Sequence, residues 1–172
     1  MSTKTNMTPA MAAEKIITLL GEVKREGIDN LINFIRSSDY LNEATCYGHH
    51  KGQYGLMFHS LEVLDVMLRE ADAAMPRESL ILIALCHDLG KAKVNGNKVG
   101  GGFHPYRSLY ILKKNGVRLN EFEREAIGFH HPRGLKQYAA YATNPYLRLL
   151  SKGDCRSTHI DKKGGKYSFC VL

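Results

Sequence analysis

The residues best suited to chemistry follow an apolar run in the middle of the chain, at 84–91, where the sequence reads ALCHDLGK. A neutral imidazole and a carboxylate, such as His87 and Asp88, can both bind one divalent cation, and nitrogen with oxygen ligation suits transition metals or magnesium. Lys91 adds a positive charge that can hold an anion beside such an ion. The same pair is also typical of a helix-end histidine bonded to a nearby carboxylate, so the metal interpretation depends on partners elsewhere in the chain.

Further candidate ligands lie inside predicted helices or at their ends. In chain order they are His59, His104, His130, His131 and Asp154. A histidine on an apolar helix face is more often a packed core residue than a ligand. For His59 the ligand interpretation is favoured, because antiparallel neighbouring helices can bring it together with His87 and Asp88 around one ion.

The spacing of apolar residues predicts the helices that must position these side chains. The run 80–85 predicts a core helix, and Gly90 is a natural left-handed stop just beyond its last turn. The other site helices are expected to begin at Gly55, at His104 with Pro105 in its first turn, at about Leu119 with an end at Pro132, and at Tyr146 with an end near Cys155.

The remaining segments are expected to surround this group of helices. Residues 1–45 should hold a helical hairpin packed on the core, and 39–53 reads as a polar loop that approaches the site. The glycine-rich stretch 92–102 predicts a flexible loop or a small β-hairpin, which acts either as a lid or as a plain surface loop. A tyrosine-rich connection should follow Pro132, and a short strand or a tail should lie at 166–172.

Composition limits the class of protein. With 172 residues, 44% hydrophobic and 24% charged, the chain fits one globular domain, and no apolar run approaches the roughly 20 residues that span a bilayer. We expect a cytoplasmic protein without a signal peptide. The four cysteines show no paired spacing, so reduced thiols are the default. The net charge of +7 favours anionic ligands, and its densest part is best explained as a solvated basic tail at 159–172.

Taken in chain order, the motif His, His-Asp, Asp with HDLGK at its centre resembles the HD-domain superfamily of metal-dependent phosphohydrolases. The segments GIDNLINFIRSSDYLNEATCYGHHKGQYGLMFHSLEV and LIALCHDLGK are similar to the stand-alone HD hydrolases of bacteria and prophages, and also to the HD domains of certain bacterial exoribonucleases. The resemblance implies an all-α helical bundle, with one HD domain over 1–172 whose metal-site helices occupy 55–158.

The resemblance also implies the ligands. A first metal would be held by His59, His87, Asp88 and Asp154, while FHPYRS and AIGFHHP match the positions where two-metal members carry further histidines, here His104, His130 and His131. We therefore expect one or two divalent ions, with manganese, iron, cobalt, nickel, zinc and magnesium all open.

The expected function is hydrolysis of a phosphate ester or anhydride of a nucleotide by a metal-activated water, with Asp88 and Lys91 as catalytic residues. Lys91 would also contact the substrate, together with Arg107, His49 and His50. Two alternatives remain open, a nuclease for single-stranded nucleic acid and a metal-binding or nucleotide-binding module without turnover. The sequence leaves the substrate, the metal and the oligomeric state undetermined.

Overall fold

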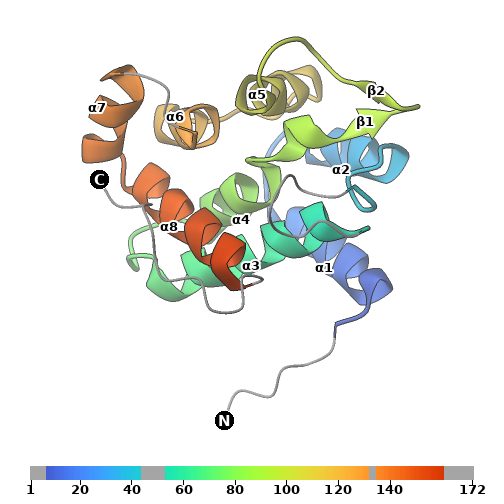
Figure 1. Ribbon diagram of the computed structural model, residues 1–172, viewed down its shortest axis with the longest axis horizontal. Coiled ribbons are helices and arrows are strands. Elements are labelled where there is room, and N and C mark those ends of the chain that lie inside the picture. Colours follow the sequence, from blue (N-terminus) through green and yellow to red (C-terminus); the bar gives the residue numbers. More distant parts are fainter. Residues whose placement is uncertain (1–6, 44–52, 132–134, 161–172) are drawn as a thin grey trace.

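The computed structural model describes residues 7–43, 53–131 and 135–160, and it is a bundle of helices (Figure 1). The first half contains α1 (Pro9–Glu22), α2 (Ile28–Ser37), α3 (Gly55–Glu70), α4 (Arg77–Cys86) and the 3-10 turn η1 (Leu89–Lys91). The second half contains β1 (Lys93–Val94), β2 (Asn97–Lys98), α5 (His104–Lys114), α6 (Glu121–Phe129), α7 (Leu135–Thr143) and α8 (Pro145–Ile160). The predicted all-α fold is confirmed.

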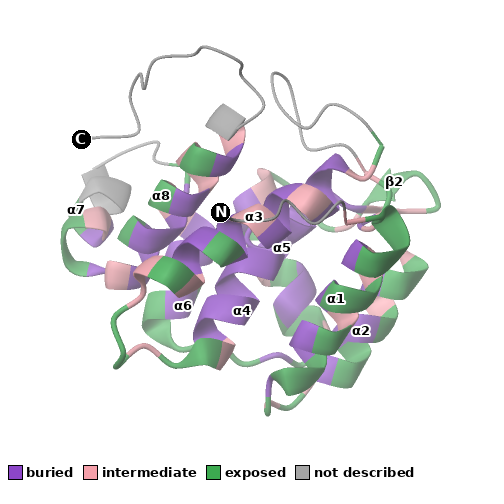
Figure 2. Ribbon diagram, turned by 90° about the horizontal axis from the view of Figure 1, so that it is seen from below, coloured by how far each residue is buried: buried purple, intermediate pink, exposed green. Residues whose placement is uncertain are grey.

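Helix α4 is the centre of the bundle, and the other elements are arranged around it (Figure 2). Every residue from Ser79 to Cys86 is buried. An α-helix that is apolar on all sides must be covered on all sides, and α1, α3, α6 and α8 all contact α4. The end of α4, with His87 and Asp88, is therefore inside the bundle and not at its surface.

The N-terminal helices form as predicted, and among the ion pairs that join this segment to the rest of the bundle the one between Arg25 and Glu123 has the most buried carboxylate. Thr8 caps α1 by accepting a hydrogen bond from the amide of Met11 at 3.2 Å. Beyond α1, the guanidinium of Arg25 binds both oxygens of Glu123 at 2.7 Å each, and the Glu123 side chain is completely buried at the start of α6. This pairing fixes the α1–α2 connection against α6.

The glycine-rich stretch 92–102 contains a short antiparallel hairpin, with Lys93 opposite Lys98. A small β-hairpin was one of the two forms predicted for this stretch. The expectation for Gly90 was wrong. Gly90 does not end α4 in a left-handed conformation; it lies inside η1 and is buried. A Cβ at this position would lie 2.1 Å from the carbonyl oxygen of His104. Glycine is required there because it lets α5 pack directly on the turn that follows Asp88.

Two further differences concern the second half of the chain. The connection predicted after Pro132 contains the helix α7, for which the alanines at 139, 140 and 142 are favourable residues. Helix α8 continues to Ile160, beyond the expected end at Cys155. The strand predicted at 166–172 lies outside the described residues. Among the described residues, no helix has the length and apolar character needed to cross a membrane.

Candidate metal centre

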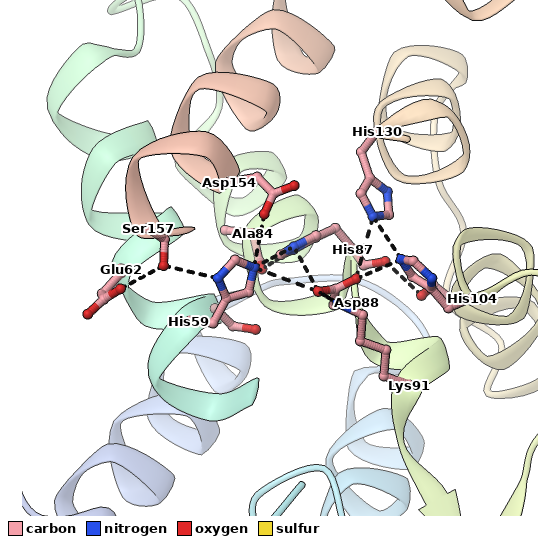
Figure 3. Close-up of polar contacts among 12 residues, drawn as sticks. His59, Glu62, Ala84, His87, Asp88, Lys91, His104, His130, Asp154 and Ser157 are labelled. Carbon is pink, nitrogen blue, oxygen red and sulfur yellow. Dashed lines mark hydrogen bonds and ion pairs between the residues drawn. The ribbon is translucent and has the colours of Figure 1, made fainter. Parts of the chain in front are cut away.

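The candidate ligands meet where α3, α8, α5 and α6 approach the end of α4 (Figure 3). They are His59 of α3, His87 and Asp88 after α4, His104 of α5, His130 and His131 after α6, and Asp154 of α8. The structure thus brings together all seven residues that were predicted as ligands. They form two neighbouring clusters.

The first cluster contains His59, His87 and Asp154. The Nε2 atoms of His59 and His87 are 3.3 Å apart, and His59 Nε2 is 3.2 Å from Asp154 Oδ1. Both imidazoles are fully buried, and the Asp154 side chain is 19% exposed. This exposure puts the open side of the cluster at α8.

The second cluster contains Asp88, His104, His130 and His131. The Nε2 atoms of His104 and His130 are 3.3 Å apart, and they lie 3.0 Å and 3.5 Å from Asp88 Oδ1. His131 is exposed, and its ring centre is 4.9 Å from that of His104. His131 therefore stands at the outer edge of the cluster.

Asp88 joins the two clusters because its two oxygens face different sides. Oδ2 lies 3.5 Å from His87 Nε2 and 3.7 Å from His59 Nε2, whereas Oδ1 faces His104 and His130. Oδ1 is buried and accepts no hydrogen bond from the described residues. A buried acceptor without a donor is costly, and a cation is one partner that would satisfy it.

The tautomers of His87 and His130 follow from their outer contacts. His87 Nδ1 lies 2.9 Å from the carbonyl oxygen of Ala84, and His130 Nδ1 lies 2.7 Å from that of Ile127. A carbonyl oxygen only accepts, so both Nδ1 atoms carry the proton and donate it. In the neutral imidazoles, each Nε2 then directs a lone pair into the centre.

His59 is oriented in the same sense by a different partner. Its Nδ1 is 3.0 Å from the hydroxyl of Ser157, which donates its proton to Glu62 Oε2 at 2.6 Å. Because that hydroxyl gives its proton to Glu62, its lone pair faces His59 and favours the tautomer with the proton on Nδ1. The Nε2 atoms of three imidazoles and the oxygens of Asp88 and Asp154 converge here, and the Lys91 ammonium at Oδ2 of Asp88 supplies only part of the positive charge that these groups favour. This donor set fits divalent cations.

Burial keeps the site in the protonation state that a cation requires. It lowers the pKa of His87 to about 3 and also lowers the pKa of His104, against the opposing effect of Asp88. For Asp88 burial acts in the other direction, but the ammonium of Lys91 and neighbouring imidazoles outweigh it and hold the pKa well below its ordinary value. Neutral imidazoles beside an ionised carboxylate are the forms in which these groups bind metals.

The two predicted substrate contacts on the described helices and turns have different surroundings. The Lys91 side chain is 13% exposed, and its ammonium contacts Asp88 Oδ2, so it lies at the site. Arg107 is buried, and its guanidinium donates to the carbonyl oxygens of Gly90, at 2.7 Å, and Gly102. Arg107 therefore links α5 to the loop that precedes it. Its contact with substrate stays a prediction.

Ser108 completes that link, and its two backbone contacts could not be predicted from the sequence, which shows only that it lies beside Arg107 near a helix start. Its hydroxyl accepts from the amide of Gly90 and donates to the carbonyl of His87, both at 2.8 Å. Ser108 thus fixes the backbone that carries Asp88 to the helix that carries His104. Ser157 and Glu62 were also missed, because a single serine or glutamate on a helix gives no signal of its partner. The predicted substrate contacts His49 and His50 lie outside the described residues.

Comparison with known proteins agrees with this geometry. The family model of the HD domain matches residues 56–159, which is more than half of the chain and includes all seven candidate ligands. Neither the comparison with curated proteins nor that with solved structures found a match.

Proposed function

The chain belongs to the HD domain family, whose members are typically metal-dependent phosphohydrolases, and on this basis we propose that it hydrolyses a phosphate ester or anhydride of a nucleotide. The observation that carries the proposal is the convergence of unprotonated imidazole nitrogens and carboxylate oxygens around Asp88. A divalent ion bound there would polarise a phosphoryl oxygen and lower the pKa of a water molecule, which makes hydroxide available near neutral pH.

Each cluster supplies the ligands for one ion in this proposal. His59, His87 and Asp154 with Oδ2 of Asp88 would hold one, and His104 and His130 with Oδ1 would hold the other. His131 stands beside the second group. The prevalence of imidazole ligands favours manganese, iron, cobalt, nickel or zinc over magnesium, which prefers oxygen. The occupancy is testable by elemental analysis: two ions per chain are expected, and a His104→Ala variant should retain one.

Lys91 is proposed to act on the substrate. Its ammonium lies against Asp88, and its side chain is partly exposed, so the phosphate of a substrate bound beside Asp88 would meet it. Loss of one group that stabilises transition-state charge typically costs about 3 kcal/mol of barrier. We expect Lys91→Ala to lower kcat by about 100-fold while the metal content stays unchanged, and a loss of metal in this variant would assign Lys91 to the ion instead.

The decisive experiment is a screen for activity. The protein is freed of metal with a chelator, loaded with each of the six candidate ions, and incubated with nucleotides, cyclic nucleotides, dinucleotides and short single-stranded oligonucleotides. Asp88→Asn is the matched control, because it keeps the size of the side chain but removes its charge. Release of phosphate or cleavage of a small nucleotide by the wild type alone supports the proposal. Cleavage of oligonucleotides alone would make the protein a nuclease, and no turnover with any ion would make it a binding module.

A further inference from the structure

His59 is held in its orientation differently from the other two buried histidines of the centre. His87 and His130 each bond to a carbonyl three residues earlier in their own segment. His59 instead bonds to the hydroxyl of Ser157, on another helix, and through it to Glu62. We propose that Ser157 and Glu62 are positioning residues that keep the proton of His59 on Nδ1 and so keep Nε2 available for a cation. The proposal rests on the metal site of the function proposed above.

The direction of this hydrogen-bonded chain follows from its last member. The Ser157 hydroxyl donates to Oε2 of Glu62 at 2.6 Å, and a hydroxyl has only one proton to donate. The hydroxyl then offers a lone pair to His59, and the imidazole must donate from Nδ1 at 3.0 Å. Ser157 is completely buried, so water does not compete for its hydroxyl.

The same two helices hold both ends of the His59 ring. Glu62 follows His59 by three residues on α3, and Ser157 follows Asp154 by three residues on α8, so each pair shares one helix face. Ser157 contacts Nδ1 on one side of the ring while Asp154 lies 3.2 Å from Nε2 on the other (Figure 3). The docking of α8 on α3 therefore sets the position and the tautomer of the imidazole together.

A role limited to holding the two helices together would give different results from a role in setting the tautomer. Glu62→Gln retains the size of the side chain, and the amide can still bond to Ser157. However, the amide group can also donate, which frees the hydroxyl of Ser157 to donate to His59 and moves the imidazole proton to Nε2. The substitution thus changes the direction of the chain of hydrogen bonds without removing a side chain from the interface.

The test compares four variants with the wild type. Ser157→Ala removes the hydroxyl, Ser157→Thr restores it, Glu62→Gln changes the acceptor, and Thr158→Ala is the control, since that hydroxyl donates to the carbonyl of Cys155 in its own helix. Nitrogen-15 spectra of the metal-free proteins, measured at an alkaline pH where the imidazoles are neutral, identify which nitrogen of His59 carries the proton. A His59→Gln variant assigns the signal. Competition with a chromophoric chelator gives the affinity for zinc.

We expect Nδ1–H in the wild type, in Ser157→Thr and in Thr158→Ala, and a population with Nε2–H in Ser157→Ala and Glu62→Gln. Removal of such outer partners typically weakens metal binding by about 10–100-fold, and the same loss is expected in these two variants. Nε2–H in the wild type, or an unchanged tautomer and zinc affinity in Glu62→Gln, would overturn the proposal even if Ser157→Ala did not fold. Neither measurement depends on turnover, so a protein that binds zinc as described but hydrolyses no nucleotide refutes the proposed function alone.

Discussion

Replacement of Gly90 by alanine should disturb the contact on which the second cluster depends. The added Cβ would lie 2.1 Å from the carbonyl oxygen of His104 and 2.8 Å from the Cβ of Arg107. Neither atom is the end of a flexible side chain, so α5 itself must shift. Overpacking of this kind typically costs about 1–3 kcal/mol, and contacts with backbone place Gly90→Ala near 3 kcal/mol. At roughly 2–4 °C per kcal/mol for a chain of this length, Tm should fall by roughly 6–12 °C.

The measurement is thermal unfolding followed by far-ultraviolet circular dichroism, in the presence of a chelator so that bound metal does not add to stability. Gly101→Ala is the matched control, because this exposed glycine has nothing within 4 Å of its Cβ position and no left-handed backbone. The shift of α5 should also move His104 away from Asp88 Oδ1, so the second ion should be bound more weakly. If Gly90→Ala and Gly101→Ala unfold at the same temperature, the close approach of α5 to the η1 turn is not what positions His104.

Four further outcomes are expected. Arg25→Ala should lower the free energy of unfolding by about 3 kcal/mol in urea titrations, since it leaves the buried carboxylate of Glu123 without its charged partner. Burial raises the pKa of Glu123, but its hydrogen bonds, above all those from Arg25, lower it more, so the pKa in the folded protein lies below the ordinary value of 4.5. As the pH falls, Glu123 is therefore protonated in the unfolded chain before it is protonated in the folded one. The stability that this carboxylate contributes is therefore present above pH 4.5 and lost below it, and wild type and Glu123→Gln should converge in stability as the pH falls through that range. Asp88→Ala should remove both ions in elemental analysis and Asp154→Ala only one, because only Asp88 has oxygens facing both clusters; equal losses would contradict that division. Gly21→Ala should raise the free energy of unfolding by about 0.5–1 kcal/mol, since the position is helical and open, and a loss of stability would show an unrecognised contact.

The helices and the candidate ligands could be predicted because their signals are local. Apolar periodicity identifies α3, a continuous apolar run identifies α4, and a histidine beside an aspartate at the end of that run is visible without knowledge of the fold. Gly90 shows the limit of such reasoning. Its identity was noticed, but as a helix stop, because the sequence cannot show that another helix packs against it.

Residues that act through distant partners carry contacts that the sequence did not show. Arg107 was predicted to bind substrate from its place near a helix start, and the structure adds that its guanidinium bonds to the carbonyls of Gly90 and Gly102, while its contact with substrate stays a prediction. Ser157 was not singled out at all, since its importance depends on two residues of α3 that are distant in sequence. Whether a polar side chain contacts a ligand or the protein's own backbone depends on the tertiary structure. The spacing of residues in a single sequence does not show which of the two it contacts.

The contact between His59 and Ser157 spans 98 positions of the chain and has a consequence for biosynthesis. Pairings between distant segments form after local helices, and here α3 leaves the ribosome long before α8 is made. A growing chain that already exposes His59 and His87 lacks Asp154, so it has only part of the first cluster and no fixed tautomer at His59. The nascent protein should therefore compete weakly for cellular metal, and its affinity should rise only when α8 docks.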